Sequence, residues 1–154
     1  MILPDVNLLV YAYNSDAPQH VRAKGWWERC VAGSQPVALP WVVSLGFLRV
    51  MTSRVALERP MAMATALDHL RSWLEQPSVR LLQPGPRHLA ILTGFADAGV
   101  LSGALLTDAH IAALAIEHQA LVHSNDSDFA RFPGLRWINP LTTPPAPAPP
   151  SRAG

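Results

Sequence analysis

Short apolar runs alternate with longer stretches of helical periodicity over the first 141 residues. Each run ends at Asp, Pro or Asn, and apolar positions spaced three and four residues apart follow it. Strands are predicted at 2–3, 37–39, 79–82 and 121–123, and helices at 6–14, 19–32, 41–53, 61–75, 86–99 and 107–119. Strands that alternate with helices of this length predict an α/β fold with a mostly parallel sheet.

Proline is concentrated near the C-terminus, where six of the fifteen prolines fall between Pro140 and Pro150. This composition favours polyproline II and cannot bury apolar surface. No Gly/Ser linker or internal repeat divides the residues before it. We therefore predict one globular domain over 1–141 and a flexible Pro-rich tail over 142–154.

The chain is unusually poor in charge: 15% of its residues are charged and 49% are apolar. Average soluble proteins have roughly 25% charged residues, so the composition excludes a disordered polyelectrolyte. The net charge of +1 supplies no general positive field for nucleic acid, so any such contact must be local. All basic residues except Lys24 are Arg, which suits bidentate phosphate or carboxylate contacts, although a GC-rich genome produces the same bias.

A single cysteine, Cys30, excludes an intramolecular disulfide and favours a reducing cytoplasm. With no histidine nearby, Cys30 is expected to be a packed thiol rather than a nucleophile. His110 and His118 are eight residues apart, which does not match the spacing of a helical zinc site. No apolar run approaches the roughly 18 residues of a membrane span, so no membrane association is predicted.

Four aspartates form the strongest candidate site. Asp5 follows the first apolar run and Asp126 follows the last, so a parallel sheet places both at the same edge. Asp108 opens the helix predicted at 107–119 among apolar neighbours, and Asp128 lies two residues beyond Asp126. Carboxylates that converge in a poorly hydrated cleft repel one another unless a cation neutralises them. Ligands that are all oxygen suit Mg²⁺ or Mn²⁺, and such a cluster is a plausible phosphodiester site.

Helix capping is the competing interpretation, because Asp is favoured at N-caps and first turns. Asn7 is expected either to cap a helix or to hydrogen-bond Asp5. The hypothesis therefore depends on convergence of the four aspartates rather than on any one of them. Motifs of lipases, phosphate loops and dinucleotide-binding folds do not occur.

Six blocks of the chain, among them the Asp-x-Asn start, resemble a known family. They span residues 2–7, 39–41, 46–52, 107–115, 125–129 and 134–141. In these blocks the chain resembles the PIN-domain family, and in particular the VapC-type toxins of bacterial toxin–antitoxin pairs. The resemblance covers essentially the whole predicted domain, and the order and spacing of residues 107–141 are its most specific part.

The resemblance implies a three-layer α/β/α PIN-like fold. It also implies a cytoplasmic endoribonuclease that depends on Mg²⁺ or Mn²⁺, cleaves RNA through metal-activated water and is neutralised by a cognate antitoxin. An unpaired loop of tRNA or rRNA is the candidate substrate. By position, Asp5, Asp108 and Asp126 correspond to the catalytic metal ligands and Asp128 to an accessory metal-binding acid. Asn7 and Ser124 correspond to supporting polar groups.

One position departs from the family pattern: Gly46 stands where the family commonly has Glu. This departure leaves open a catalytically weakened PIN-fold module that binds antitoxin or RNA without hydrolysis. Arg49, one helical turn later, is either a phosphate clamp or an ordinary surface arginine. A haloacid dehalogenase-type phosphatase is a further alternative, but Asn7 replaces its second Asp and Lys24 lies too early. The apolar helices predicted at 41–53 and 61–75 suggest a homodimer with a groove for an antitoxin segment.

Overall fold

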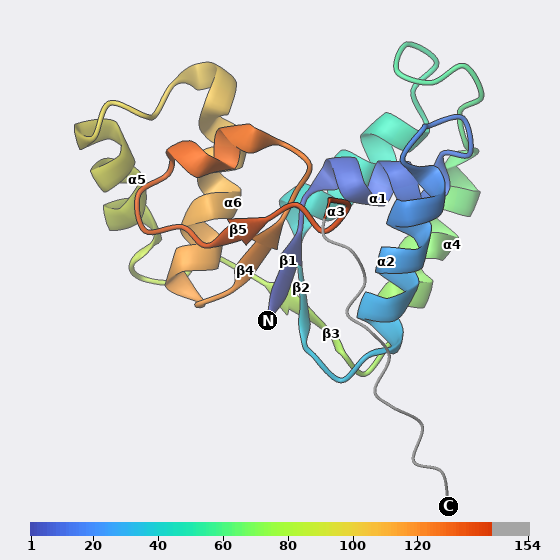
Figure 1. The fold of residues 1–154 in the computed structure, drawn as a ribbon, viewed down its shortest axis with the longest axis horizontal. Coiled ribbons are helices and arrows are strands. Elements are labelled where there is room, and N and C mark those ends of the chain that lie inside the picture. Colours follow the sequence, from blue (N-terminus) through green and yellow to red (C-terminus); the bar gives the residue numbers. More distant parts are fainter. Residues whose placement is uncertain (143–154) are drawn as a thin grey trace, which may run out of the picture.

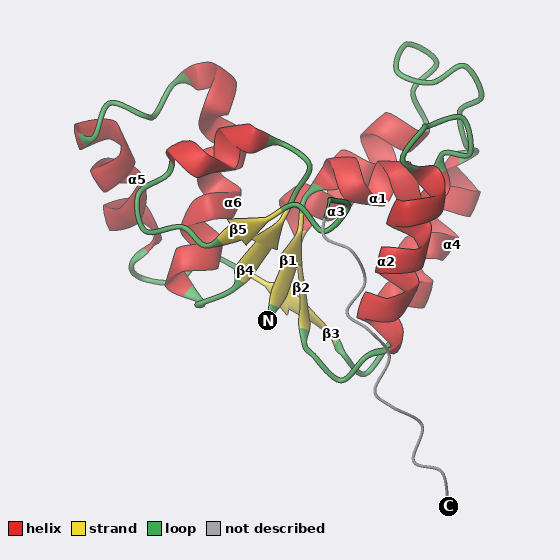
Figure 2. Ribbon diagram, viewed as in Figure 1, coloured by secondary structure: helices red, strands yellow, loops and turns green. Residues whose placement is uncertain are grey.

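A five-stranded sheet forms the centre of the fold in the computed structural model, which describes residues 1–142 (Figures 1 and 2). The strands are β1 (Ile2–Pro4), β2 (Val37–Pro40), β3 (Val79–Leu82), β4 (Leu121–His123) and β5 (Trp137–Ile138). They lie in the order β3-β2-β1-β4-β5, and every neighbouring pair is parallel. The predicted parallel α/β sheet is confirmed.

Six α-helices connect the strands: α1 (Val6–Tyr13), α2 (His20–Ala32), α3 (Trp41–Met51), α4 (Met63–Leu74), α5 (His88–Asp97) and α6 (Leu106–Glu117). Each agrees with its predicted range to within two residues at either end. Helices α1–α4 lie on one side of the sheet, and α5 and α6 lie on the other (Figure 2). These layers are the α/β/α arrangement that the resemblance implied.

The sequence prediction missed β5, which pairs with β4 through Val122↔Trp137 and His123↔Ile138. A strand of two residues is too short to show the alternation of buried and exposed positions by which strands are recognised. The 3₁₀ helices η1 (Gly103–Leu105) and η2 (Ser127–Arg131) were also missed. The predicted tail, apart from its first residue, lies outside the described residues.

From β1 the chain first builds the sheet in one direction, through β2 and β3, and then returns to the other side of β1 with β4 and β5. The order of the strands therefore reverses at β1. Ligands of open α/β sheets bind at such a reversal, beyond the carboxyl ends of the strands. At this edge β1 leads into α1, and β4 leads into the loop before η2.

Buried side chains hold α6 in place where it approaches the same edge of the sheet from the α5–α6 layer. Ile111 and Leu114 of α6 are fully buried, and each stabilises the fold by about 1.5–3 kcal/mol. Cys30 of α2 is also buried, as expected for a packed thiol. Within residues 1–142 no helix is both long and apolar enough to cross a membrane.

Candidate active site

Two of the predicted acids meet at the carboxyl ends of β1 and β4. Asp5 directly follows β1, and Asp126 follows β4 by three residues. The two strands are paired through Pro4↔His123, so the residues that follow them are neighbours. The buried Ser124 hydroxyl donates to Asp5 Oδ2 at 2.7 Å and accepts from the backbone N–H of Asp126 at 2.9 Å. One hydroxyl therefore sets the position of both acids.

Asp5 is also the N-cap of α1, because its Oδ1 accepts from the backbone N–H of Val6 at 2.7 Å. Only 5% of Asp5 is exposed. Burial raises the pKa of its carboxyl above the ordinary value, hydrogen bonds from Ser124 and Val6 oppose this rise, and the charge of Asp126 adds to it. Asp5 therefore caps α1 with one carboxylate oxygen and still lies beside Asp126.

Asp108 lies in the first turn of α6 and shares its surroundings with the other three acids. Burial, followed by the charges of Asp5, Asp126 and Asp128 in that order, raises the pKa of Asp108 to about 6. The three other carboxylates are therefore near enough to act electrostatically on Asp108. We call Asp5, Asp108, Asp126 and Asp128 the acid cluster.

The acids after β4 are held by the first turn of η2. Asp126 Oδ1 accepts from the backbone N–H of Asp128 at 2.8 Å and so caps η2. Asp128 Oδ1 lies 3.2 Å from Arg131 Nε at the end of the same 3₁₀ helix. Asp128 therefore already has a cationic partner, whereas Asp108 forms no ion pair within the described part of the chain.

Two other predicted site residues form no hydrogen bond or ion pair with the acid cluster within residues 1–142. Asn7 is exposed on α1 and makes no hydrogen bond to Asp5 within residues 1–142, because Val6 and Ser124 occupy that carboxylate. Arg49 is exposed on α3. No ion pair or hydrogen bond of its side chain is found in the described region.

Comparison with known proteins agrees with this geometry. The PIN domain family model matches residues 2–135. The chain belongs to the PIN-domain family. "Ribonuclease VapC33" of Mycobacterium tuberculosis strain H37Rv is 46% identical over 141 residues, covering 92% of this chain and 99% of that protein. "Ribonuclease VapC37" of the same strain is 37% identical over 140 residues, covering 91% and 97%. The resemblance to VapC-type PIN domains is thus confirmed.

Solved structures of low sequence identity share the fold. VapBC2 from Rickettsia felis, bound to a promoter DNA fragment, has a TM-score of 0.62 at 20% identity and covers 90% of this chain and 98% of its own. Mycobacterium tuberculosis VapC20, a sarcin-ricin loop cleaving toxin, has a TM-score of 0.58 at 17% identity, with coverage of 88% and 99%. The predicted three-layer PIN fold is confirmed.

The packing around Gly46 leaves little space for a side chain. A Cβ at this position would lie 2.6 Å from Val6 Cγ2, much closer than a carbon–carbon contact allows. Helix α3 therefore approaches the first turn of α1 closely where Gly46 lies. Any side chain here would push against Val6, which is bonded directly to Asp5.

The donors of this PIN domain suit a hard divalent ion. The acid cluster offers only carboxylate oxygens, and a bound cation would relieve the repulsion that the other carboxylates exert on Asp108. Within residues 1–142 no three His, Cys, Asp or Glu side chains are gathered closely enough to enclose a metal directly. This arrangement fits Mg²⁺ or Mn²⁺ that keeps several of its waters.

His123 is a residue near the site that the sequence did not single out. Its Nδ1 accepts from Trp26 Nε1 at 3.0 Å. Burial, with a contribution from the N-terminal amino group, lowers the pKa of His123 to about 4, so its ring is neutral at pH 7. This histidine packs against α2 and contributes no charge to the acid cluster. The Asp128–Arg131 pair was also missed, although its spacing of three residues is typical of such pairs.

Proposed function

We propose that this PIN domain is an endoribonuclease that hydrolyses RNA phosphodiester bonds with the help of Mg²⁺ or Mn²⁺. Asp5, Asp108 and Asp126 are its catalytic residues, and Asp128 is an accessory metal-binding acid. The observation that carries this proposal is the meeting of the acids at the carboxyl ends of β1 and β4, where the Ser124 hydroxyl joins Asp5 to the backbone of Asp126. Burial and the charges of the other three acids raise the pKa of Asp108 to about 6, which agrees with this grouping. Relatives named ribonucleases that align over 97–99% of their length support the reaction class.

The chain's own residues orient the acids. Ser124 donates to Asp5 and so favours its ionised form. Asp108 is mostly ionised above pH 6 and becomes neutral below it, so the negative charge that attracts a cation falls in mildly acidic solution. Asp5, Asp108 and Asp126 would hold the divalent ion, which would supply polarisation of a phosphodiester and a lower pKa for a bound water. Ser124 acts as a positioning residue, because it orients Asp5 and Asp126 without facing the substrate itself.

We further propose that a cognate antitoxin neutralises the enzyme and that the chain forms a homodimer. Solved neighbours include VapBC assemblies, which supports a protein partner. Apolar side chains remain exposed on two helices that the sequence already marked for contacts. They are Trp41 and Leu45 of α3, and Met63 and Leu67 of α4.

A binding module without hydrolysis remains the second candidate, because Gly46 lacks a carboxylate at its position in the PIN pattern. The close contact between Gly46 and Val6 supports this alternative, since it leaves no room for Glu without rearrangement. A simple Gly46→Glu variant is therefore a poor test. The paired variant Val6→Ala/Gly46→Glu makes space for the added side chain.

The deciding experiment is RNA cleavage by purified chain free of antitoxin. Single-stranded RNA is incubated with Mg²⁺, Mn²⁺ or EDTA, and the wild type is compared with Asp108→Asn and with Asp68→Asn, an exposed aspartate on α4. We expect cleavage by the wild type and by Asp68→Asn with either metal, and none by Asp108→Asn. RNA binding without cleavage by the wild type, with cleavage restored in Val6→Ala/Gly46→Glu, would establish the binding module instead.

A further inference from the structure

A stripe of polar and aromatic side chains runs along one side of α1, from the exposed Asn7 next to the acid cluster, through the half-buried Tyr11, to the half-buried C-cap residue Asn14. Asn7, Tyr11 and Asn14 are spaced four and three residues apart, so they share one side of the helix. The residues between Asn7 and Tyr11 are buried. At about 1.5 Å per residue, the stripe extends roughly 10 Å from the end that adjoins Asp5. No hydrogen bond engages the Tyr11 phenol within residues 1–142.

An oriented arginine stands at the far end of this stripe. Asn14 Oδ1 accepts from the backbone N–H of Asp16 at 3.1 Å, and Asp16 in turn binds Arg59. Arg59 Nε donates to Asp16 Oδ2 at 3.1 Å, and Nη2 donates to the other carboxylate oxygen. The Nη1 group takes no part in this pair. Asn14, Asp16 and Arg59 also line one cavity of about 270 Å³, which places the arginine beside the stripe.

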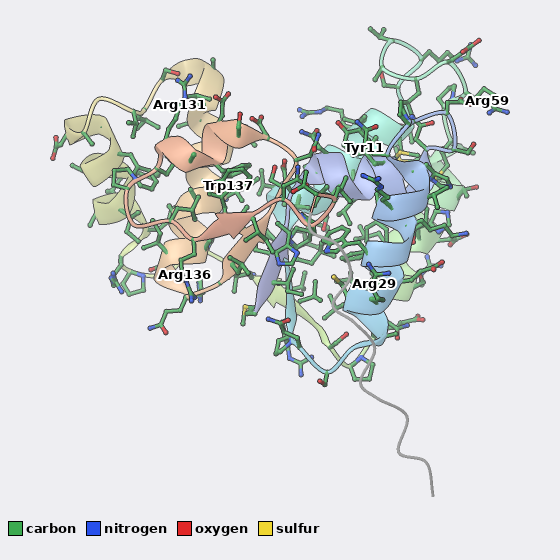
Figure 3. The ribbon with its side chains drawn as sticks, in the orientation of Figure 1. Tyr11, Arg29, Arg59, Arg131, Arg136 and Trp137 are labelled. Carbon is green, nitrogen blue, oxygen red and sulfur yellow. The ribbon has the colours of Figure 1, made fainter. Side chains whose placement is uncertain are left out.

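A second oriented arginine lies on the other side of the acid cluster. Arg131 meets Asp128 through Nε, which leaves both Nη atoms outside that contact. Asp128 acts electrostatically on Asp108, so Arg131 borders the acid cluster directly. In the view of Figure 3, Arg131, Tyr11 and Arg59 lie across the upper half of the molecule, with Tyr11 between the two arginines, whereas Arg29 and Arg136 lie lower.

We infer that single-stranded RNA crosses the acid cluster between Arg131 and Arg59, with phosphates bound by these two arginines and an unpaired base stacked on Tyr11. The inference rests on the proposed function and names how the substrate is held. The carboxylates repel phosphates, and the net charge of +1 offers no general attraction, so cations on both sides of the cluster are needed. Each arginine is held in place by a carboxylate and keeps N–H groups for a phosphate.

The chemistry of the stripe selects an unpaired strand. A base stacks on Tyr11 only when it is free of a duplex, and stacking accepts every base. The amides of Asn7 and Asn14 flank Tyr11 and can hydrogen-bond the edges of splayed bases. The name RNA path is used below for Asn7, Tyr11, Asn14, Arg59 and Arg131.

Binding is measured by fluorescence anisotropy with a labelled single-stranded RNA in EDTA, which prevents metal-dependent cleavage. We expect Tyr11→Ala to weaken binding by about 10-fold, and Tyr11→Phe to stay within about 2-fold because its ring still stacks. Arg131 forms an ion pair with Asp128, so Asp128→Asn/Arg131→Gln removes both charges and should reduce the slope of log K against log salt by about 0.7. Arg29→Gln and Arg136→Gln are the matched controls, and neither should change the slope.

Arg59 needs a paired variant, because Arg59→Gln alone leaves Asp16 as an added negative charge. Asp16→Asn/Arg59→Gln removes both charges and should still lower the salt slope by about 0.7 if Arg59 binds phosphate. In cleavage assays with Mg²⁺, Tyr11→Ala should raise KM with little change in kcat, because stacking holds the substrate and does not touch the reacting phosphate. Melting temperatures of all variants are compared to confirm folding.

The outcomes separate the RNA path from the nuclease itself. If the wild type cleaves RNA while Tyr11→Ala and Asp128→Asn/Arg131→Gln bind RNA no differently from Arg29→Gln, the RNA path is overturned and the nuclease stands. A wild type that binds RNA through these residues but never cleaves it supports the path and overturns the nuclease. A chain that binds no RNA under any of these conditions refutes both.

Discussion

Asp108→Asn should make the folded chain more stable at pH 7.5. The rise in the pKa of Asp108 to about 6, from an ordinary 3.8, corresponds to about 3 kcal/mol of unfavourable interaction for the ionised carboxylate. Solvent screening of this partly exposed group reduces that figure to about 1–2 kcal/mol. Replacing the charged Asp108 by neutral Asn also removes about 0.5 kcal/mol of favourable interaction between the carboxylate and the N-terminus of α6. The net gain is about 0.5–1.5 kcal/mol, or a melting temperature higher by about 1–5 °C.

The pH dependence follows from the direction of the shift. The folded chain binds the Asp108 proton more tightly than the unfolded chain, so the ionised carboxylate destabilises the fold increasingly as pH rises from about 4 to 6. Above pH 6 the penalty is constant, and below pH 4 it disappears because both states are protonated. The advantage of Asp108→Asn should therefore shrink markedly between pH 7.5 and pH 4.5.

Thermal melting followed by circular dichroism in EDTA measures this advantage for wild type, Asp108→Asn and the control Asp68→Asn. Asp68 forms an exposed pair with Arg71, so its replacement should change stability by less than about 0.5 kcal/mol at either pH. Adding Mg²⁺ should raise the melting temperature of the wild type much more than that of Asp108→Asn. A variant destabilised by more than about 1 kcal/mol at pH 7.5 would show that Asp108 serves as a helix cap, and the acid cluster would lose its basis.

Three further outcomes are expected. Ser124→Ala should lower the free energy of unfolding, measured in urea, by about 1–2 kcal/mol and should slow RNA cleavage, because the Ser124 hydroxyl joins Asp5 to the loop after β4. An unchanged cleavage rate would show that Ser124 is not a positioning residue. Gly46→Ala should lower the free energy of unfolding by about 1–3 kcal/mol, and adding Val6→Ala should recover much of that loss in a double-mutant cycle. If the destabilisation by the two substitutions simply adds, the Gly46–Val6 contact does not limit the packing. Burial raises the pKa of Cys30 to about 11, so iodoacetamide at pH 8 should label it only after denaturation, and rapid labelling of folded chain would refute this.

The helices could be predicted because their signal is local. Apolar residues spaced three and four apart mark the buried side of a helix wherever the helix packs, so α1 to α6 were found to within two residues. Strand β5 carries no such signal, since its two residues become a strand only by pairing with β4. The role of Asn7 could not be settled for the same reason, because the partners that satisfy Asp5 come from Val6 and from Ser124, 119 residues away.

By itself, the sequence determined the parallel α/β class, the identity of the acids and the family. Residue type, spacing and periodicity are properties of the chain, and they are the same before and after folding. The tertiary structure alone decided that Ser124 ties Asp5 to the loop of Asp126, that Gly46 is required by its contact with Val6, and that Asp108 is repelled by three other carboxylates. Hydrogen bonds, steric contacts and charge repulsion act through distances in space, and those distances exist only once β1, β4 and α6 have come together.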